Sequence, residues 1–264
     1  MYKRQYLNCA DKLLKNAGIR RGLAHSVNMG MVIDTLFRGN MRRLGSYMEG
    51  YGDLTLPLKA PEYSKKKAME YFARAGYREM GEDGVLKNER GERLVVELTF
   101  ADSSTLMTNV CSILRQEALK CGVDLRLDPL TYNVCSRKVF EKRYQAALWA
   151  WPLQTPFPRL YETFASELAY DARGNPVGNT NNIFAVADTE LDAALNAERN
   201  APDDAALKKA LHRAQKRIHE LCVWIPGWRE PYTYVACWRW IRWPESPTRF
   251  CSCLLYTSRA HETS

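Results

Sequence analysis

The sequence predicts an α/β protein in which helices cover a largely parallel sheet. Segments with strand character at 94–100, 123–127 and 144–151 are separated by segments with helical periodicity. Strands that alternate with helices form parallel sheets, because each helix crosses over the sheet and returns the chain to the same edge. With 264 residues, of which 46% are hydrophobic, the chain can bury the core that such a sheet needs.

The helices before the first of these strands are marked by caps and breaks. Between residues 19 and 38 a helical stripe of apolar residues is broken near Asn28 and ended by Gly39, which predicts two short helices in tandem. Residues 40–63 are rich in Gly, Tyr and Pro without a period, so they predict an irregular loop. Ser64 can then cap a helix that Gly76 ends.

The middle of the chain carries the clearest alternation. Turn signals at Gly84 and Gly91 predict a hairpin that leads into strand 94–100. A helix from Ser104 to Lys120 follows, and strand 123–127 comes directly after Gly122. The next helix begins near residue 131, and its side chains expected to face the core are Val134, Val139 and Phe140. Strand 144–151 then ends in two tryptophans.

The remaining elements are mostly scaffold. A loop broken by prolines leads to a helix over 159–169, and a loop rich in Gly and Asn leads to a helix capped by Asp188. A long amphipathic helix over 203–222 points five apolar side chains inward, namely Leu207, Leu211, Ala214, Ile218 and Leu221. Aromatic residues with strand character follow over 224–243.

Composition excludes some classes and leaves others open. The net charge is +8, and much of the excess lies near the start of the chain. Nucleic acid is not the expected partner, because the basic residues are not interleaved with stacking aromatics. No run approaches the about 18 apolar residues of a membrane span, and the eight cysteines form no CxxC pair, so buried thiols are expected. The early basic residues are Lys3, Arg4, Lys12, Lys15, Arg20, Arg21, Arg38, Arg42 and Arg43.

The sequence lacks the common catalytic and metal-binding motifs. The GxGxxG, GxxxxGK[ST], HExxH and GxSxG motifs are absent, so no enzyme and no cofactor is expected. His212, His219 and Cys222 can share a helix face, but no fourth ligand lies nearby, and boundary histidines are the commoner case. Glu162 and Glu167 fit a solvated helix face better than a pair of catalytic acids.

Six motifs in order resemble one family. The stretch "IRRGLAHSVNMGMVIDTLFRG" is similar to the segment that opens the second lobe of bacterial extracellular solute-binding proteins of family 5, the oligopeptide and microcin type. "APEYSKKKAMEYFARAGY", "LRQEALKCGVDLRLDPLTYNV" and "RYQAALWAW" resemble the helices and strands that follow in that family. "FAVADTELDAAL" and "IPGWREPYTYVACWRWIRWP" resemble its closing helix and ending, so the resemblance covers about residues 19–244.

The resemblance implies a type II periplasmic-binding-protein-like lobe within an incomplete two-lobe protein. Residues 19–222 would form the second lobe, with 1–18 as an inter-lobe or upstream segment and 223–252 returning toward the first lobe. Such a protein is expected to capture a peptide or peptide-like ligand, without catalysis, and deliver it to the permease subunits of an ABC importer. It would be a monomer in the periplasm or at the cell surface, with its signal sequence upstream, and would meet the membrane only through the permease or a lipid anchor.

The expected ligand contacts lie on loops and at a strand end. Trp149 and Trp151 share one face of their strand, and either pack in the core or form walls of the ligand cleft. Gln154 and Thr155 are expected as polar contacts in "WPLQTPFP", a loop that lacks the Gly and Asp found in much of the family. Asn181, Asn182 and Tyr47 complete the set, the asparagines as amide contacts.

The sequence leaves one alternative function open. The same lobe can serve as the ligand-sensing domain of a cytosolic transcriptional regulator, in which case the early basic residues would face DNA.

The last twelve residues, "CLLYTSRAHETS", back-translate to a sequence that resembles a sequencing-library adaptor. Residues 253–264 are therefore expected to lie outside the natural protein.

Overall fold

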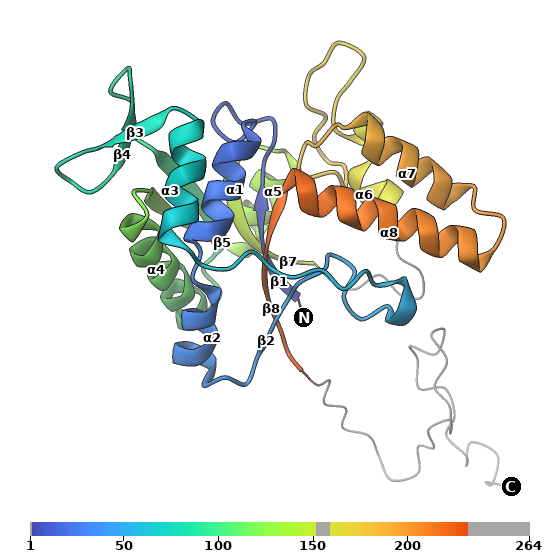
Figure 1. The fold of residues 1–264 in the computed structure, drawn as a ribbon, viewed down its shortest axis with the longest axis horizontal. Helices are drawn as coiled ribbons and strands as arrows, with labels where there is room; N and C mark the ends of the chain where they lie inside the picture. The colour runs from blue at the N-terminus through green and yellow to red at the C-terminus, as the bar shows by residue number, and fades with distance from the viewer. Residues whose placement is uncertain (1, 152–158, 232–264) are drawn as a thin grey trace, which may run out of the picture.

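A six-stranded sheet forms the centre of the part of the chain that the computed structural model describes, residues 2–151 and 159–231 (Figure 1). Its strand order is β2-β8-β1-β7-β5-β6. A separate hairpin consists of β3 (Tyr77–Met80) and β4 (Leu86–Asn88). The strands of the central sheet are β1 (Tyr2–Leu7), β2 (Arg42–Arg43), β5 (Val95–Ala101), β6 (Asp124–Leu130), β7 (Ala146–Trp151) and β8 (Trp224–Arg229).

The directions of the strands make the sheet mixed but mostly parallel, as predicted. β5 pairs in parallel with both β6 and β7. β1 pairs antiparallel with β7 and with β8, so β8 runs in the same direction as β5, β6 and β7. The short β2 is antiparallel to β8. Four of the six described strands therefore end at the same edge of the sheet, and the predicted α/β class is confirmed.

Helices cover both faces of this sheet and close two hydrophobic cores (Figure 1). Alternate residues of β7 serve the two cores: Leu148 belongs to the first, and Ala147 and Trp149 to the second. The first core is covered by α1 (Ala17–Ser26), α2 (Met29–Phe37), α3 (Lys65–Arg74) and α4 (Thr105–Lys120). The second is covered by α5 (Tyr132–Phe140), α6 (Leu160–Phe164), α7 (Thr189–Arg199) and α8 (Asp204–Leu221).

The side-chain caps predicted at Ser64 and Asp188 form, and Asn28 and Ser104 also cap helices. Asn28 accepts a hydrogen bond from the backbone N–H of Met31, which starts α2 and explains why the helical stripe breaks there. Ser64, Ser104 and Asp188 cap α3, α4 and α7 in the same way. Gly122 ends α4 with φ +85°, where a Cβ would lie 2.5 Å from Cγ of Leu86, so this turn requires glycine.

Three features of the fold differ from the sequence-based expectations. Val134 is exposed on α5 and does not face the core, because Cys135 and Val139 occupy the buried side of that helix. The helix expected over 159–169 ends at Phe164 and continues as a 3-10 turn over Ser166–Leu168. The unpredicted β1 lies in the middle of the sheet, next to β8, so residues 2–7 and 224–229 share one sheet with the lobe expected over 19–222.

Candidate functional site

The edge where β5, β6, β7 and β8 end is the candidate ligand-facing surface, and we call it the carboxyl edge. β5 ends there at Ala101 and β6 at Leu130, two residues that pair with each other. Tyr2, at the start of β1, pairs with both Trp151 of β7 and Arg229 of β8. Ligands of α/β sheets bind beyond the carboxyl ends of the strands, because the loops and helix starts converge there.

An aromatic pair lies at the carboxyl edge. Trp149 of β7 is 7% exposed, and the ring of Tyr132 stacks on it with centroids 5.2 Å apart and planes 20° apart. Tyr132 is the first residue of α5, directly after β6, and is 61% exposed. The inner ring therefore belongs to the core, while the outer ring presents an apolar surface to solvent.

Arginines lie on β2 and β8, the strands on the other side of β1 from β7 at this edge. Arg42 of β2 lies directly across from Arg229 of β8, and Arg43 lies across from Trp228. Nε of Arg229 is 4.0 Å from Oε1 of Glu49, and its Nη1 donates to the carbonyl of Glu230. Burial lowers the pKa of Arg43 to about 10, because desolvation disfavours the charged guanidinium.

Arg4 of β1 links the sheet to the irregular loop over residues 40–63. It is buried, and its Nη2 donates a 2.7 Å hydrogen bond to the carbonyl of Tyr47. Its guanidinium lies 4.4 Å from the centre of the Tyr47 ring and 5.0 Å from that of Trp224. Tyr47, expected as a ligand contact, is thus part of the second core, where its ring packs edge-on against Phe164 and Trp224.

The two expected asparagine contacts lie away from the carboxyl edge. The adjoining carbonyls of Ile183 and Phe184 accept hydrogen bonds from Tyr144 and Cys9, which stand at the opposite edge of the sheet. Asn182 is 0% exposed. Its Nδ2 donates to the carbonyls of Ala165 and Val186, and its Oδ1 accepts from the N–H of Val186. In this arrangement Asn182 has no free amide hydrogen to offer a ligand, unlike the half-exposed Asn181.

The other three expected contacts, Trp151, Gln154 and Thr155, lie at or beyond the end of the described range 2–151. Gln154 and Thr155 lie outside the described residues. Trp151 is described only as the last residue of β7, paired with Tyr2. Of the seven expected contacts, the structure therefore places Trp149 and the backbone of Trp151 together at the carboxyl edge.

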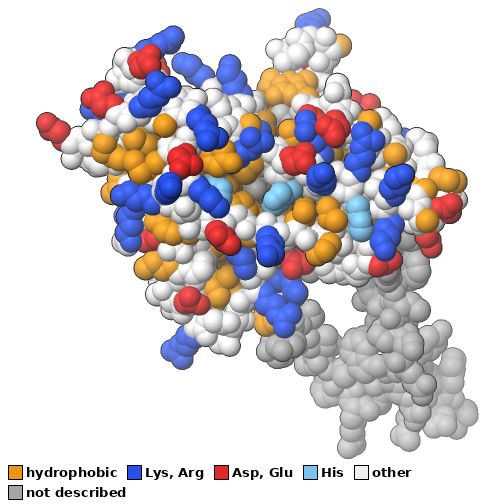
Figure 2. Space-filling model, viewed as in Figure 1, with side chains coloured by type: hydrophobic (Ala, Val, Ile, Leu, Met, Phe, Trp, Pro, Cys, Tyr) orange, Lys and Arg blue, Asp and Glu red, His pale blue; other side chains and the backbone are white. Residues whose placement is uncertain are grey.

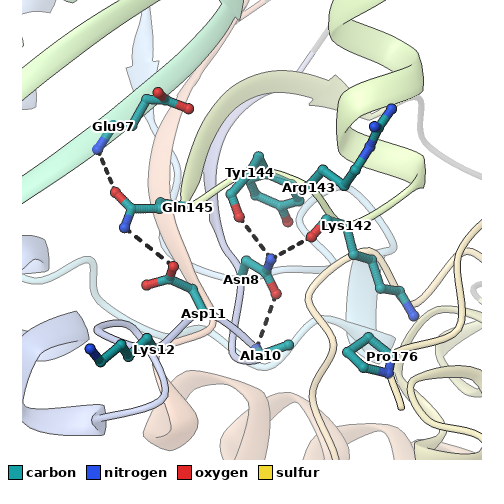
Figure 3. A pocket seen from close by; sticks show the side chains of 10 residues that line it. All are labelled: Asn8, Ala10, Asp11, Lys12, Glu97, Lys142, Arg143, Tyr144, Gln145 and Pro176. Atoms are coloured by element: carbon teal, nitrogen blue, oxygen red, sulfur yellow. Dashed lines mark hydrogen bonds between the residues drawn. The ribbon is translucent and has the colours of Figure 1, made fainter.

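A polar pocket of about 370 Å³ opens at the opposite edge of the sheet (Figure 3). Asn8 donates to the carbonyls of Lys142 and Tyr144, and Gln145 bridges the N–H of Glu97 and the carboxylate of Asp11. These side chains hold the ends of β1, β5 and β7 together. Asn8 and Gln145 thus use their amide groups to hold the strands together, which is a structural role.

A second cavity, of about 530 Å³, lies where α6, α7 and the start of α8 meet. Glu198 in its wall accepts a hydrogen bond from the N–H of Leu160, and burial raises its pKa to about 7. Within the described residues no cluster of three His, Cys, Asp or Glu side chains is arranged to hold a metal ion.

The family model for bacterial extracellular solute-binding proteins, family 5, matches residues 1–168. The chain belongs to this family. No curated protein matches the chain in sequence. None of the helices in the described part of the chain has the length and apolar character needed to cross a membrane.

Solved structures share the fold at low sequence identity. The oligopeptide-binding protein AppA from Bacillus subtilis, solved with a nonapeptide, matches with a TM-score of 0.76 and 16% identity over 88% of this chain and 47% of its own. NikZ from Campylobacter jejuni, solved with Ni(L-His), matches with a TM-score of 0.71 and 20% identity over 86% and 44%. An oligopeptide-binding protein from Thermus thermophilus, solved with a pentapeptide, matches with 0.73 and 18% over 87% and 41%. The chain thus spans less than half the length of these structures.

Two features of the carboxyl edge in this family 5 chain were not predicted from the sequence. They are the exposed ring of Tyr132 and the cross-strand pair of Arg42 and Arg229. Tyr132 carried one available signal, since it starts a helix directly after a strand and therefore had to lie at the carboxyl edge. The arginine pair carried none, because Arg42 and Arg229 are far apart in sequence and meet only through the register of β2 on β8.

Proposed function

We propose that this chain is the second lobe of a binding protein that captures peptides for an ABC importer. The observation that carries the proposal is the geometry of the carboxyl edge, where β1 starts beside the end of β8 and next to the end of β7 (Figure 1). Two neighbouring strands that reach one edge in opposite directions suit a pair of connections to another lobe. The family and the peptide-bound structures of AppA and the Thermus thermophilus protein support the same assignment.

Capture would occur between the carboxyl edge and a first lobe. The two cores make this lobe a rigid half of a clamp, and ligand binding would favour the closed arrangement because the ligand contacts both halves. Tyr132, supported from behind by Trp149, would form an apolar wall. Trp151 would extend this wall, with Gln154 and Thr155 as polar contacts from the loop that follows β7.

Delivery requires an extracytoplasmic location. Such a protein would act in the periplasm or at the cell surface and meet the permease subunits of its importer there. Uptake of a labelled peptide by cells that express the protein, compared with cells that lack it, tests this part. Equal uptake in both, with no permease or ATPase genes beside the gene, would contradict the transport assignment.

Binding is tested by calorimetric titration of the full-length protein with peptides of two to nine residues. Tyr132→Ala is expected to weaken binding by about 2-fold to 10-fold, since an aromatic contact contributes about 0.5–1.5 kcal/mol. Tyr132→Phe keeps the ring and is expected to bind like the parent.

Val134→Ala is the matched control, because Val134 is exposed on the same helix two residues further along. Unchanged affinity in Tyr132→Ala would remove this side chain from the site. Failure of the parent protein to bind any of the peptides would overturn the proposed function.

A further inference from the structure

Positive charge is concentrated on three helices of the lobe. Together, α1, α3 and α8 carry eleven Lys and Arg residues against three Asp and Glu residues. This excess equals the net charge of +8 of the whole chain. In contrast, α7, which packs against α8, carries three acidic residues and one basic residue. Acidic and basic residues are therefore segregated between helices of the lobe.

The three basic helices lie side by side (Figure 1). α1 packs closely on α3, since a Cβ at Gly22 would lie 2.3 Å from the ring of Phe72. At its other side α1 meets the end of α8, where Nη2 of Arg21 donates to the carbonyl of Glu220. Figure 2 shows Lys and Arg side chains spread over the surface that these helices form.

Six exposed side chains of these helices have no carboxylate partner, and we call them the basic face. Within the described part of the chain, none of the six lies within 4.0 Å of a carboxylate oxygen, whereas Lys216 and Arg217 of α8 do have acidic neighbours. The basic face consists of Arg21, Lys65, Lys66, Lys67, Lys209 and Arg213.

The three lysines of α3 are placed where a helix disfavours them. Lys65, Lys66 and Lys67 are its first three residues, and its first turn contains no acidic residue. The N-terminus of a helix carries a partial positive charge, so cations there destabilise it. The hydroxyl of Ser64 accepts a hydrogen bond from the N–H of Lys67 and caps the helix in spite of this charge. Stability of α3 therefore does not account for three lysines at this position.

An extended anionic surface fits the basic face better than a small anion does. Neither of the two cavities described above is lined by any of its six residues. The 18 residues of α8 alone span about 27 Å, so the charges are spread over a wide area. A bilayer with anionic headgroups offers charge over such an area, and each Lys or Arg close to it strengthens binding by about 5-fold.

We propose that the basic face binds the surface of a membrane that contains anionic phospholipids. The choice of lipid rests on the proposed function, because a binding protein outside the cytoplasm works beside a membrane. Helices α1, α3 and α8 are turned to the viewer in Figure 1, whereas β8 ends at the lower side of the lobe. The carboxyl edge would therefore stay free for ligand capture while the protein lies on the membrane.

The test is co-sedimentation of the full-length protein with vesicles in the absence of peptide. Vesicles of phosphatidylcholine are compared with vesicles in which about one third of the lipid is phosphatidylglycerol, at low salt and at about 1 M salt. The protein is expected to bind the anionic vesicles at least about 10-fold more tightly, and to lose this preference at high salt, where charges are screened within about 3 Å. Equal binding to both kinds of vesicle at low salt would overturn the proposal. Tighter binding to duplex DNA than to the anionic vesicles, at equal phosphate concentration, would assign the face to nucleic acid and overturn it as well.

The principal variant replaces Lys65, Lys66 and Lys67 together by glutamine. It is expected to weaken binding to the anionic vesicles by at least about 10-fold, since each lysine contributes about 5-fold. The melting temperature of the free protein should not fall, because the three side chains are exposed and lie at the unfavourable end of α3 for a cation.

The matched control replaces Arg115, Arg126 and Arg137 together by glutamine. These arginines are exposed on α4, β6 and α5, and β6 lies at the opposite end of the strand order from β2 and β8. The control removes the same charge from another part of the surface and should change vesicle binding by less than about 3-fold. An equal loss of binding in both variants would contradict the assignment to the basic face.

Peptide titration of the parent protein separates the two proposals. If the protein binds peptides but shows no preference for anionic vesicles, the membrane contact is overturned while the proposed function stands. If it binds anionic vesicles through the basic face but binds no peptide, the proposed function fails and the membrane contact stands.

Discussion

Replacing Asn182 by alanine separates a structural role for this residue from a role in ligand contact. The side chain is fully buried, donates to the carbonyls of Ala165 and Val186, and accepts from the N–H of Val186. Alanine leaves these three backbone groups without a partner in a site that water does not reach. Each such group costs about 1–3 kcal/mol, and partial relaxation of the loop brings the expected total to about 3–5 kcal/mol.

The assay is equilibrium urea unfolding of the full-length protein, followed by tryptophan fluorescence. At about 2–4 °C per kcal/mol, the same loss corresponds to a fall in melting temperature of roughly 6–20 °C. Asn181→Ala is the matched control: its side chain is half-exposed and next in sequence, so a change within about 0.5 kcal/mol is expected. A stable Asn182→Ala variant that loses peptide affinity would refute the structural reasoning and restore the ligand contact predicted from the sequence.

Two further predictions concern charged groups. Arg20→Met should destabilise the fold by about 3–5 kcal/mol in urea unfolding, because the buried guanidinium donates to the carbonyls of Leu14 and Leu221 and so joins α1 to the end of α8. Arg21→Met removes an exposed hydrogen bond to the carbonyl of Glu220 and should cost less than about 1 kcal/mol. Burial raises the pKa of Glu198 to about 7 from an ordinary value of 4.5, so its protonated form stabilises the fold at low pH and this contribution is lost as the pH rises through 7. Glu198→Gln keeps an acceptor for the N–H of Leu160 and should be more stable than the parent by about 1–2 kcal/mol at pH 8.5, with little difference at pH 5. A uniform effect of the glutamine at both pH values, or an equal effect of Glu70→Gln on exposed α3, would contradict this assignment.

Elements defined by local signals were predicted from the sequence. The helices that begin at Ser64, Ser104 and Asp188 have side-chain caps that satisfy their first amide groups, and such caps act over three residues. β5, which precedes α4, is a short and mostly apolar run, and β6, which precedes α5, alternates leucine with polar residues, so both carry a strand pattern. The α/β class followed because these local elements alternate.

The central strand β1 was not predicted, for a physical reason. Its sequence contains Arg4 and Gln5, which are buried in the structure although such residues are rarely buried without partners. The partners of Arg4 are Tyr47 and Trp224, which are 43 and more residues away in sequence. A pattern of neighbouring residues carries no information about such contacts.

The sequence by itself determined the succession of helices and strands, the resemblance to family 5 and the place of Trp149 at a strand end, because these depend on neighbours in the chain. Only the tertiary structure decided which polar side chains are available to a ligand. It buried Asn182 and Tyr47, exposed Tyr132, and set Arg42 against Arg229. Burial and cross-strand register arise when distant segments pack together, so the ligand-facing surface of this lobe is a property of the assembled sheet.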